Sequence, residues 1–121
     1  MRAVLTRTCM YEKDGEEIFV IDGHVHMWDA RKENIIHEGG EQFLQCFYDY
    51  HTGFTPEEEQ WDIDEYRHYG PDKMAEDLFG NAAADMAIFQ PTYLDDFYDE
   101  GFNTTEQNAE LAEKYPERFV L

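Results

Sequence analysis

Residues 18–28 read IFVIDGHVHMW, and this stretch decides the fold that we expect. Four apolar residues in succession are typical of a buried strand. Because side chains alternate between the two faces of a strand, His24 and His26 share one face with Val20 and Asp22. We therefore predict a strand over residues 18–27 that becomes polar on this face toward its carboxyl end. The other face is apolar and suits packing under helices: Phe19, Ile21, Gly23, Val25 and Met27.

Signals for helices and strands alternate along the rest of the chain. The turn residues at 13–15 follow a short apolar run at 3–11, so we expect these runs to form a hairpin that leads into the main strand. Residues 28–70 are interpreted as a mostly helical insertion. Within it we predict a half-buried stripe of Phe43, Cys46, Phe47 and Tyr50, and a second helix that starts at residues 55–58.

Residues 71–121 continue the alternation. They contain a helix, a short apolar strand at 86–90, a helix with a capping pattern at 103–106, and a further strand from residue 118. Such alternation favours parallel strands joined by crossover helices. The sequence therefore predicts an α/β fold in which residues 1–121 form the N-terminal part of one (β/α)8 TIM-like barrel, with a helical insertion after strand 1. A complete barrel needs about 250 residues, so we expect the remaining half in the same or a second polypeptide.

The H-x-H pair carries the chemistry that we expect. Two imidazoles at i and i+2 on one strand face can reach the same divalent metal ion, with Zn as the first choice and Mn or Fe as alternatives. Asp22 is a candidate for orienting a ligand. Trp28, Gln90 and Thr92 are candidates for a substrate pocket, although Trp28 could equally pack under the insertion. Two histidines at this spacing also occur by chance as surface residues.

Three segments resemble a known family: residues 21–28, residues 85–92, and the stretch from Asn108 to Val120. They are similar to the first strand, the second strand, and the second helix with the third strand of the amidohydrolase superfamily. The closer likeness is to amidohydrolase family 2, the aminocarboxymuconate-semialdehyde decarboxylase-like and lactone hydrolase-like branch.

The resemblance implies a metal-dependent hydrolase or decarboxylase that acts on a small carboxylated or cyclic compound such as a lactone or amide. It also implies that His24 and His26 are metal ligands. The catalytic residues are then expected beyond Leu121, and the isolated chain is expected to be inactive. The alternative is a non-catalytic small subunit or a vestigial barrel fragment that binds a larger partner.

The acidic composition excludes some classes of binding partner. The net charge is −19, with 28 acidic against 9 basic residues, so the surface repels nucleic acid and anionic membranes. No apolar run approaches the length of a membrane span, and we expect a cytoplasmic protein that forms an oligomer. We expect two unpaired thiols, with Cys46 in the core. Cys9 is the other of these two buried thiols. The remaining histidines and acidic residues are interpreted as surface, helix-end or solvated loop residues: His37, His51, His68, Glu57–Glu59, Asp95 and Asp96.

Overall fold

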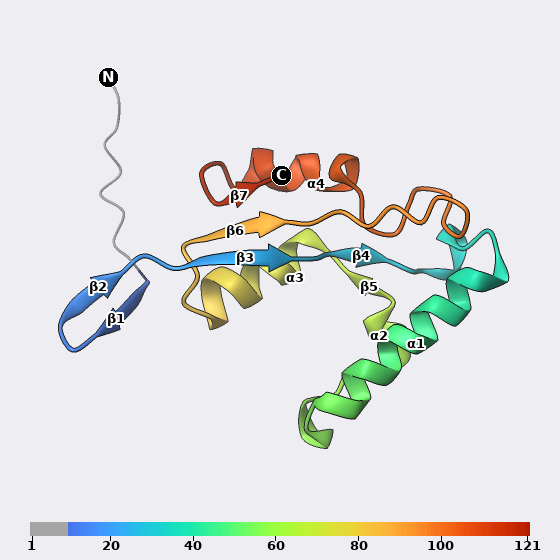
Figure 1. The fold of residues 1–121 in the computed structure, drawn as a ribbon, viewed down its shortest axis with the longest axis horizontal. Coiled ribbons are helices and arrows are strands. Elements are labelled where there is room, and N and C mark those ends of the chain that lie inside the picture. Colours follow the sequence, from blue (N-terminus) through green and yellow to red (C-terminus); the bar gives the residue numbers. More distant parts are fainter. Residues whose placement is uncertain (1–9) are drawn as a thin grey trace.

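The computed structural model describes residues 10–121 (Figure 1). Cys9 and most of the first predicted hairpin strand lie outside this range. The described strands are β1 (Tyr11–Lys13), β2 (Glu16–Ile18), β3 (Ile21–Val25), β4 (Trp28–Asp29), β5 (His68–Tyr69), β6 (Met86–Phe89) and β7 (Phe119–Val120). The helices are α1 (Glu38–Phe54), α2 (Ile63–Tyr66), α3 (Pro71–Ala75) and α4 (Thr105–Lys114). Three further helical segments are η1 (Lys32–Asn34), η2 (Glu57–Glu59) and η3 (Glu76–Asn81).

The central sheet has the order β3-β6-β7, and both of its strand pairs are parallel. Ile21 is opposite Met86, and Ala87 is opposite Phe119. The register shifts between Asp22 and Val25. The parallel pairing predicted from the alternation of strands and helices is therefore confirmed for these three strands, and it sets their carboxyl ends at one edge.

The predicted barrel is wrong. The described residues form one three-stranded parallel sheet and two separate two-stranded antiparallel sheets, β1-β2 and β4-β5. Strands of two to five residues in an open sheet make no portion of a barrel wall. The prediction from alternating helices and strands was wrong because it assumed one continuous sheet, with residues 28–70 as an insertion in it. Those residues instead form their own strand pair and their own core.

The single strand predicted over residues 18–27 is divided. Ile18 ends β2, which pairs with β1 around a turn where Asp14 and Gly15 have positive φ angles of 56° and 81°. In the described residues the hairpin pairs Tyr11–Lys13 with Glu16–Ile18, and β3 begins only at Ile21. Phe19 and Ile21 of the predicted apolar face are 42% and 51% exposed, so only the carboxyl half of that face packs under helices.

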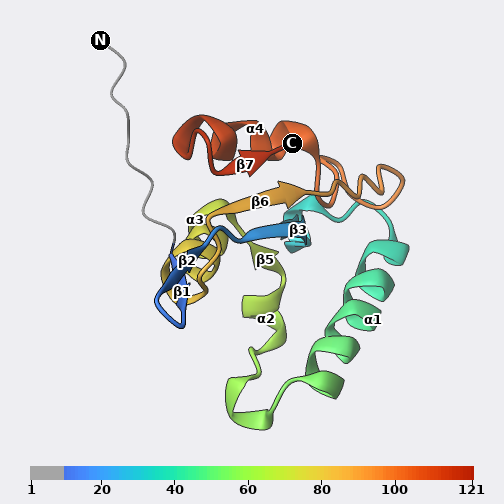
Figure 2. The same cartoon turned by 60° about the vertical axis from the view of Figure 1, so that its left-hand side comes forward.

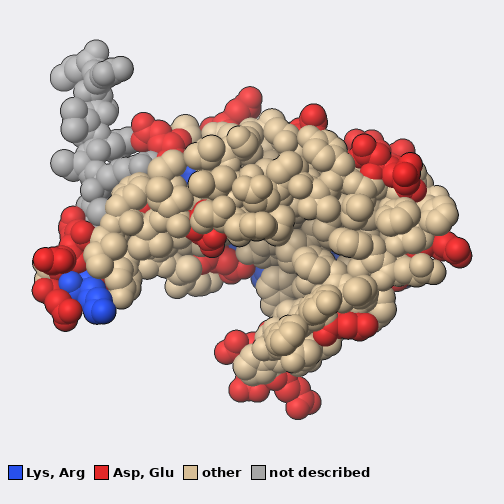
Figure 3. Space-filling view, in the orientation of Figure 1, with Lys and Arg blue, Asp and Glu red and all other residues tan. Residues whose placement is uncertain are grey.

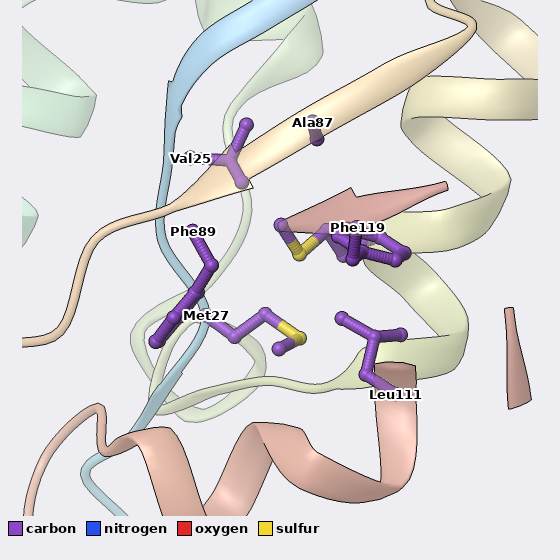
Figure 4. Close-up of a cluster of buried hydrophobic side chains, with 7 residues drawn as sticks. Val25, Met27, Ala87, Phe89, Leu111 and Phe119 are labelled. Carbon is purple, nitrogen blue, oxygen red and sulfur yellow. The ribbon is translucent and has the colours of Figure 1, made fainter. Parts of the chain in front are cut away.

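That packed half belongs to a core on one face of the parallel sheet (Figure 4). The helices α3 and α4 supply Met74 and Leu111 to it. The start of α4 is fixed by a capping box in which Thr104 accepts from the backbone of Gln107, while the Gln107 side chain accepts from the backbone of Thr104. The predicted helix start at 103–106 is therefore confirmed. The other members of this cluster come from the sheet and its exit: Val25, Met27, Ala87, Phe89 and Phe119.

A second core lies between α1, α2 and the loop before α4. Both cartoon views show α1 and α2 projecting away from the parallel sheet (Figure 2). Leu44 is 0% exposed and packs with a second group of buried residues. Cys46 is exposed and Tyr50 is 61% exposed, so the predicted core position of Cys46 and the predicted stripe are wrong at these two residues. The buried side of α1 therefore differs from the predicted one. It is the Leu44 side, because aromatic rings from two other segments pack there: Trp61, Tyr66, Tyr98 and Phe102.

The helix predicted to start at residues 55–58 is also wrong. Thr55 instead follows the end of α1 as its C-cap, and the glutamates after Pro56 form the exposed turn η2. The acidic side chains there contribute to the surface shown in Figure 3, on which Asp and Glu far outnumber Lys and Arg. Within residues 10–121, no helix is long and apolar enough to cross a membrane.

A salt bridge ties α1 to the segment after α2. Arg67 is 7% exposed and donates from Nη1 and Nη2 to Glu41, at 2.9 and 2.6 Å. The hydrogen bond from Arg67 lowers the pKa of Glu41. A lowered pKa stabilises the fold above the ordinary glutamate value of about 4.3, and this contribution disappears as the pH falls through the folded-state value.

We therefore expect Glu41→Gln to destabilise the fold at pH 7 by about 1 kcal/mol, a small figure because water screens the exposed half of the Glu41 side chain. The stability gap between wild type and variant should narrow as the pH is lowered from about 5 to 3. Urea unfolding at several pH values measures it. Asp64→Asn is the control, because Asp64 lies 3.5 Å from Arg67 and is 81% exposed. A gap that stays constant with pH would contradict the assignment.

Candidate metal site

The two histidines converge at the carboxyl end of β3. Their Nε2 atoms are 2.7 Å apart, and the rings meet edge to face with centroids 4.6 Å apart. His24 is exposed and His26 is half-buried. His24 lies on β3 and His26 is the first residue after it. The spacing of two residues in extended chain thus brings both imidazoles to one point.

One ring nitrogen of His26 contacts the main chain just after β6. Its Nδ1 lies 2.8 Å from the backbone carbonyl oxygen of Gln90. With a proton on Nδ1, the ring donates to that carbonyl and Nε2 presents a lone pair toward His24. That tautomer is the one that binds a metal through Nε2.

Asn103 lies beside this arrangement, in the loop before α4, and shares the Gln90 carbonyl with His26. Its Nδ2 atom donates to the same Gln90 carbonyl at 3.0 Å and lies 3.1 Å from Nδ1 of His26. Its backbone pairs with Thr92 in both directions, at 2.7 and 3.0 Å. Asn103 is 0% exposed, and its Oδ1 atom is buried without a hydrogen-bond partner. Sequence reasoning missed Asn103, because only the folded loop shows that it reaches His26.

The geometry fits one metal ion after a small adjustment. Two imidazole nitrogens bound to one zinc at about 2.0–2.1 Å, with a tetrahedral angle between them, are roughly 3.3 Å apart. The Nε2 atoms of His24 and His26 are 2.7 Å apart, and a small rotation of the exposed His24 ring provides the remaining space. No group of three or more His, Cys, Asp or Glu side chains suited to a metal occurs within residues 10–121. Within the described residues, two candidate ligands therefore lie together, and no third joins them.

The other predicted site residues take different places. Asp22 accepts from the backbone N–H of His24 at 3.1 Å, so it contacts the main chain of the ligand rather than its ring. Gln90 acts through its backbone carbonyl, and Thr92 through its backbone bridge to Asn103. Trp28 donates from Nε1 to the carbonyl of Tyr66 at 2.6 Å and packs beside the rings of the insertion.

Two small cavities adjoin this region. One of about 180 Å³ is lined by His26, Val25, Tyr69, Met74 and Leu78, and it offers an apolar space beside the ligand ring. A second of about 260 Å³ lies between the chain that leaves His26 and the first turn of α4. Both are at the carboxyl edge of the parallel strands, where open α/β sheets bind their ligands.

The second cavity has a charged lining that the sequence did not reveal, and it includes Trp28. Arg31 donates to Asp29 through two nitrogens at 2.9 and 2.7 Å. Burial raises the pKa of Asp29, but the hydrogen bonds and charge of Arg31 outweigh it and leave this pKa below its ordinary value. Burial, followed by the charge of Arg31, lowers the pKa of His68, which favours its neutral form at pH 7.

The remaining histidines and aspartates serve the fold or face solvent. His37 is exposed, accepts from the backbone of Gly39 and caps α1. His51 accepts from the backbone of Trp61 at 2.9 Å and stacks on Tyr66. Asp95 and Asp96 are exposed. None of these residues approaches the two converging histidines.

We expect Asn103→Leu to lower zinc affinity by about 10–100-fold, because the loss of a group that orients a metal ligand typically has this effect. The imidazole of His26 keeps its bond to Gln90 but loses its buried neighbour. A titration against a competing chelator measures the change. Asn108→Leu is a matched control, since Asn108 is also buried and its side chain bonds the backbone of Thr104. Equal zinc affinity in both variants would contradict the supporting role of Asn103.

Comparison with known proteins finds that no family model, no curated protein and no solved structure matches this chain. The resemblance to amidohydrolase family 2 therefore remains a prediction that rests on the sequence segments alone.

Proposed function

We propose that this chain supplies two imidazole ligands to a divalent metal ion, Zn first and Mn or Fe as alternatives, in a metal-dependent hydrolase or decarboxylase. The observation that supports this most directly is the set of contacts around the His26 ring. Its Nδ1 lies 2.8 Å from the Gln90 carbonyl oxygen, and its Nε2 lies 2.7 Å from Nε2 of His24.

The ligand residues are His24 and His26, while Asn103 and the Gln90 carbonyl hold the ring of His26. When bound, the ion would polarise a substrate oxygen or lower the pKa of water to near 7. The cavity of about 180 Å³ beside His26 is lined mainly by apolar side chains and would hold a small group. The substrate in this proposal is a small carboxylated or cyclic compound, and the location is cytoplasmic.

A non-catalytic subunit that lends its histidines to a larger partner is the second candidate. The observation that favours it is the incomplete ligand set, since no third suitable side chain joins the pair within residues 10–121. Catalytic zinc sites usually have three protein ligands and one open position. Turnover therefore needs at least one ligand and an acid or base in addition to the two histidines.

The test begins with the chain stripped of metal and titrated with Zn²⁺, Mn²⁺ and Fe²⁺ against a competing chelator. Turnover of lactones and carboxylated aromatic compounds is then measured on the loaded protein. Metal uptake with turnover supports the enzyme. Uptake without turnover supports the metal site alone, because both candidates need a further ligand and an acid or base before turnover occurs. Absence of uptake for all three ions would contradict the metal site itself.

A further inference from the structure

The cavity between the antiparallel pair β4-β5 and the first turn of α4 has a volume of about 260 Å³. In that pair Trp28 is opposite Tyr69 and Asp29 is opposite His68, so an aromatic part of the cavity lies beside a charged part. Arg31 is the only Lys or Arg among the described residues that line it. The volume is slightly below the range of about 300–1,000 Å³ that is usual for drug-sized ligands. The cavity therefore fits a compound with a single ring.

Arg31 is held in one orientation by Asp29. Its Nε and Nη2 atoms donate to that carboxylate at 2.9 and 2.7 Å, and its backbone N–H donates to it at 3.1 Å. The main chain of Asp29 is fixed in turn, because its N–H donates to the Phe102 carbonyl and its carbonyl accepts from Asn34, both at 2.8 Å. A guanidinium has five N–H groups in a planar fork. The bonds to Asp29 use the Nε–Nη2 edge, so Nη1 remains available for a further acceptor.

His68 brings a second hydrogen-bonding group to the cavity. Its ring packs over Gly70, where an added Cβ would lie 3.1 Å from the ring carbon Cε1. Burial is the main cause of its lowered pKa, and the charges of Arg31 and Asp29 also act on this pKa. At pH 7 the neutral ring has one N–H donor and one acceptor nitrogen. The cavity thus offers an anion one charged donor and one neutral donor.

We infer that this cavity binds the carboxylate of a small aromatic acid. Arg31 and His68 donate to the carboxylate. The ring of the acid lies against Trp28 and Tyr69, whose own rings stack with their centroids 5.0 Å apart. Met27, the residue after His26, also lines the cavity, so the bound acid adjoins the metal site. The inference rests on the proposed function where it takes this acid to be the substrate, and it then names the residues that select a carboxylated compound.

The acidic chain gives Arg31 a decisive place in this recognition. The net charge of −19 repels an anion, and salt screens this repulsion over a Debye length of about 8 Å at physiological ionic strength. Asp29 offsets the charge of Arg31, but it bonds the edge away from Nη1 and so acts on the ligand from a greater distance. Glu106 lines the same cavity and is exposed. Its negative charge opposes the binding of a carboxylate.

The experiment measures benzoate binding to the full chain stripped of metal, by calorimetry and by NMR of the two indole N–H signals. We expect benzoate to shift the signal of Trp28, which lines the cavity, more than that of Trp61, which does not. Trp61→Phe assigns the two signals. Benzamide has the ring without the charge, and acetate has the charge without the ring. Each should bind at least about 10-fold more weakly than benzoate.

Arg31→Gln should lower benzoate affinity by about 10- to 100-fold, because it removes a charged hydrogen-bond donor. The side chain of Arg31 is 48% exposed, so its replacement opens no cavity in a core, and circular dichroism verifies the fold. Lys32→Gln is the matched control. It removes the same charge from an exposed neighbour outside the cavity and should leave the affinity nearly unchanged. Glu106→Gln should tighten benzoate binding.

The failures of the two proposals are distinguishable. Zinc uptake without benzoate binding would overturn the carboxylate site and leave the metal site intact, whereas benzoate binding without zinc uptake would do the reverse. Replacing His24 and His26 together by alanine should not change benzoate affinity, and a loss there would place the probe at the histidines instead. Equal losses in Arg31→Gln and Lys32→Gln, or equal affinities for benzoate and benzamide, would also contradict carboxylate recognition by Arg31.

Discussion

Zinc binding should be lost when His24 and His26 are replaced together by alanine, with an expected fall in affinity of more than about 100-fold. The reason is that changing a group that merely orients a ligand already costs about 10–100-fold. Here both direct ligands are removed, and no other group of three metal-binding side chains occurs within residues 10–121. Competition with a chelator of known affinity measures the loss.

The fold of this double variant should be unchanged. His24 is exposed, and His26 is half-buried, so neither substitution opens a cavity in a core. The control is His37→Ala, which removes an exposed imidazole that caps α1. Its zinc affinity should equal that of the wild type. Retained zinc binding in the double variant, or turnover of a lactone that survives it, would overturn the assignment of the two ligands.

Local rules account for what was predicted correctly. The two-residue period of a strand is enough to bring His24 and His26 to one point, whatever the rest of the sheet does. The side chain of a capping residue accepts a hydrogen bond from the backbone N–H three positions later. The start of α4 could therefore be predicted from the residues around Thr104. Parallel pairing followed from alternating strand and helix signals. Each of these inferences uses a short stretch of chain or the order of elements.

Long-range contacts account for what was missed. Asn103 reaches His26 across 77 positions of sequence, and no local pattern indicates such a contact. The buried side of α1 depends on rings from two other segments, so a helical period alone selected Cys46 and Tyr50 instead of Leu44. The prediction of a barrel was wrong for a related reason. Antiparallel pairing of β4 with β5 joins the ends of residues 28–70, and the apolar pattern of that region does not show this pairing.

Leu44→Ala is expected to reduce the free energy of unfolding by about 2–5 kcal/mol. Leu44 is 0% exposed and lies in the second core with Tyr66, Tyr98 and Phe102. The substitution removes buried apolar atoms and leaves a cavity that the surrounding aromatic rings cannot fill without leaving their own contacts. Urea unfolding followed by tryptophan fluorescence is suited to the measurement, because Trp28 and Trp61 both pack against this core.

Phe54→Ala provides the contrast within the same helix. It removes a larger side chain, but Phe54 is 83% exposed, and substitutions at such positions usually change stability by less than about 0.5 kcal/mol. The pair therefore tests which side of α1 is buried. If Phe54→Ala were the more damaging change, α1 would have to pack through the opposite side, and the second core would be misassigned. Because Leu44 and the two histidines belong to different clusters, Leu44→Ala should also leave zinc affinity unchanged under conditions in which the variant remains folded.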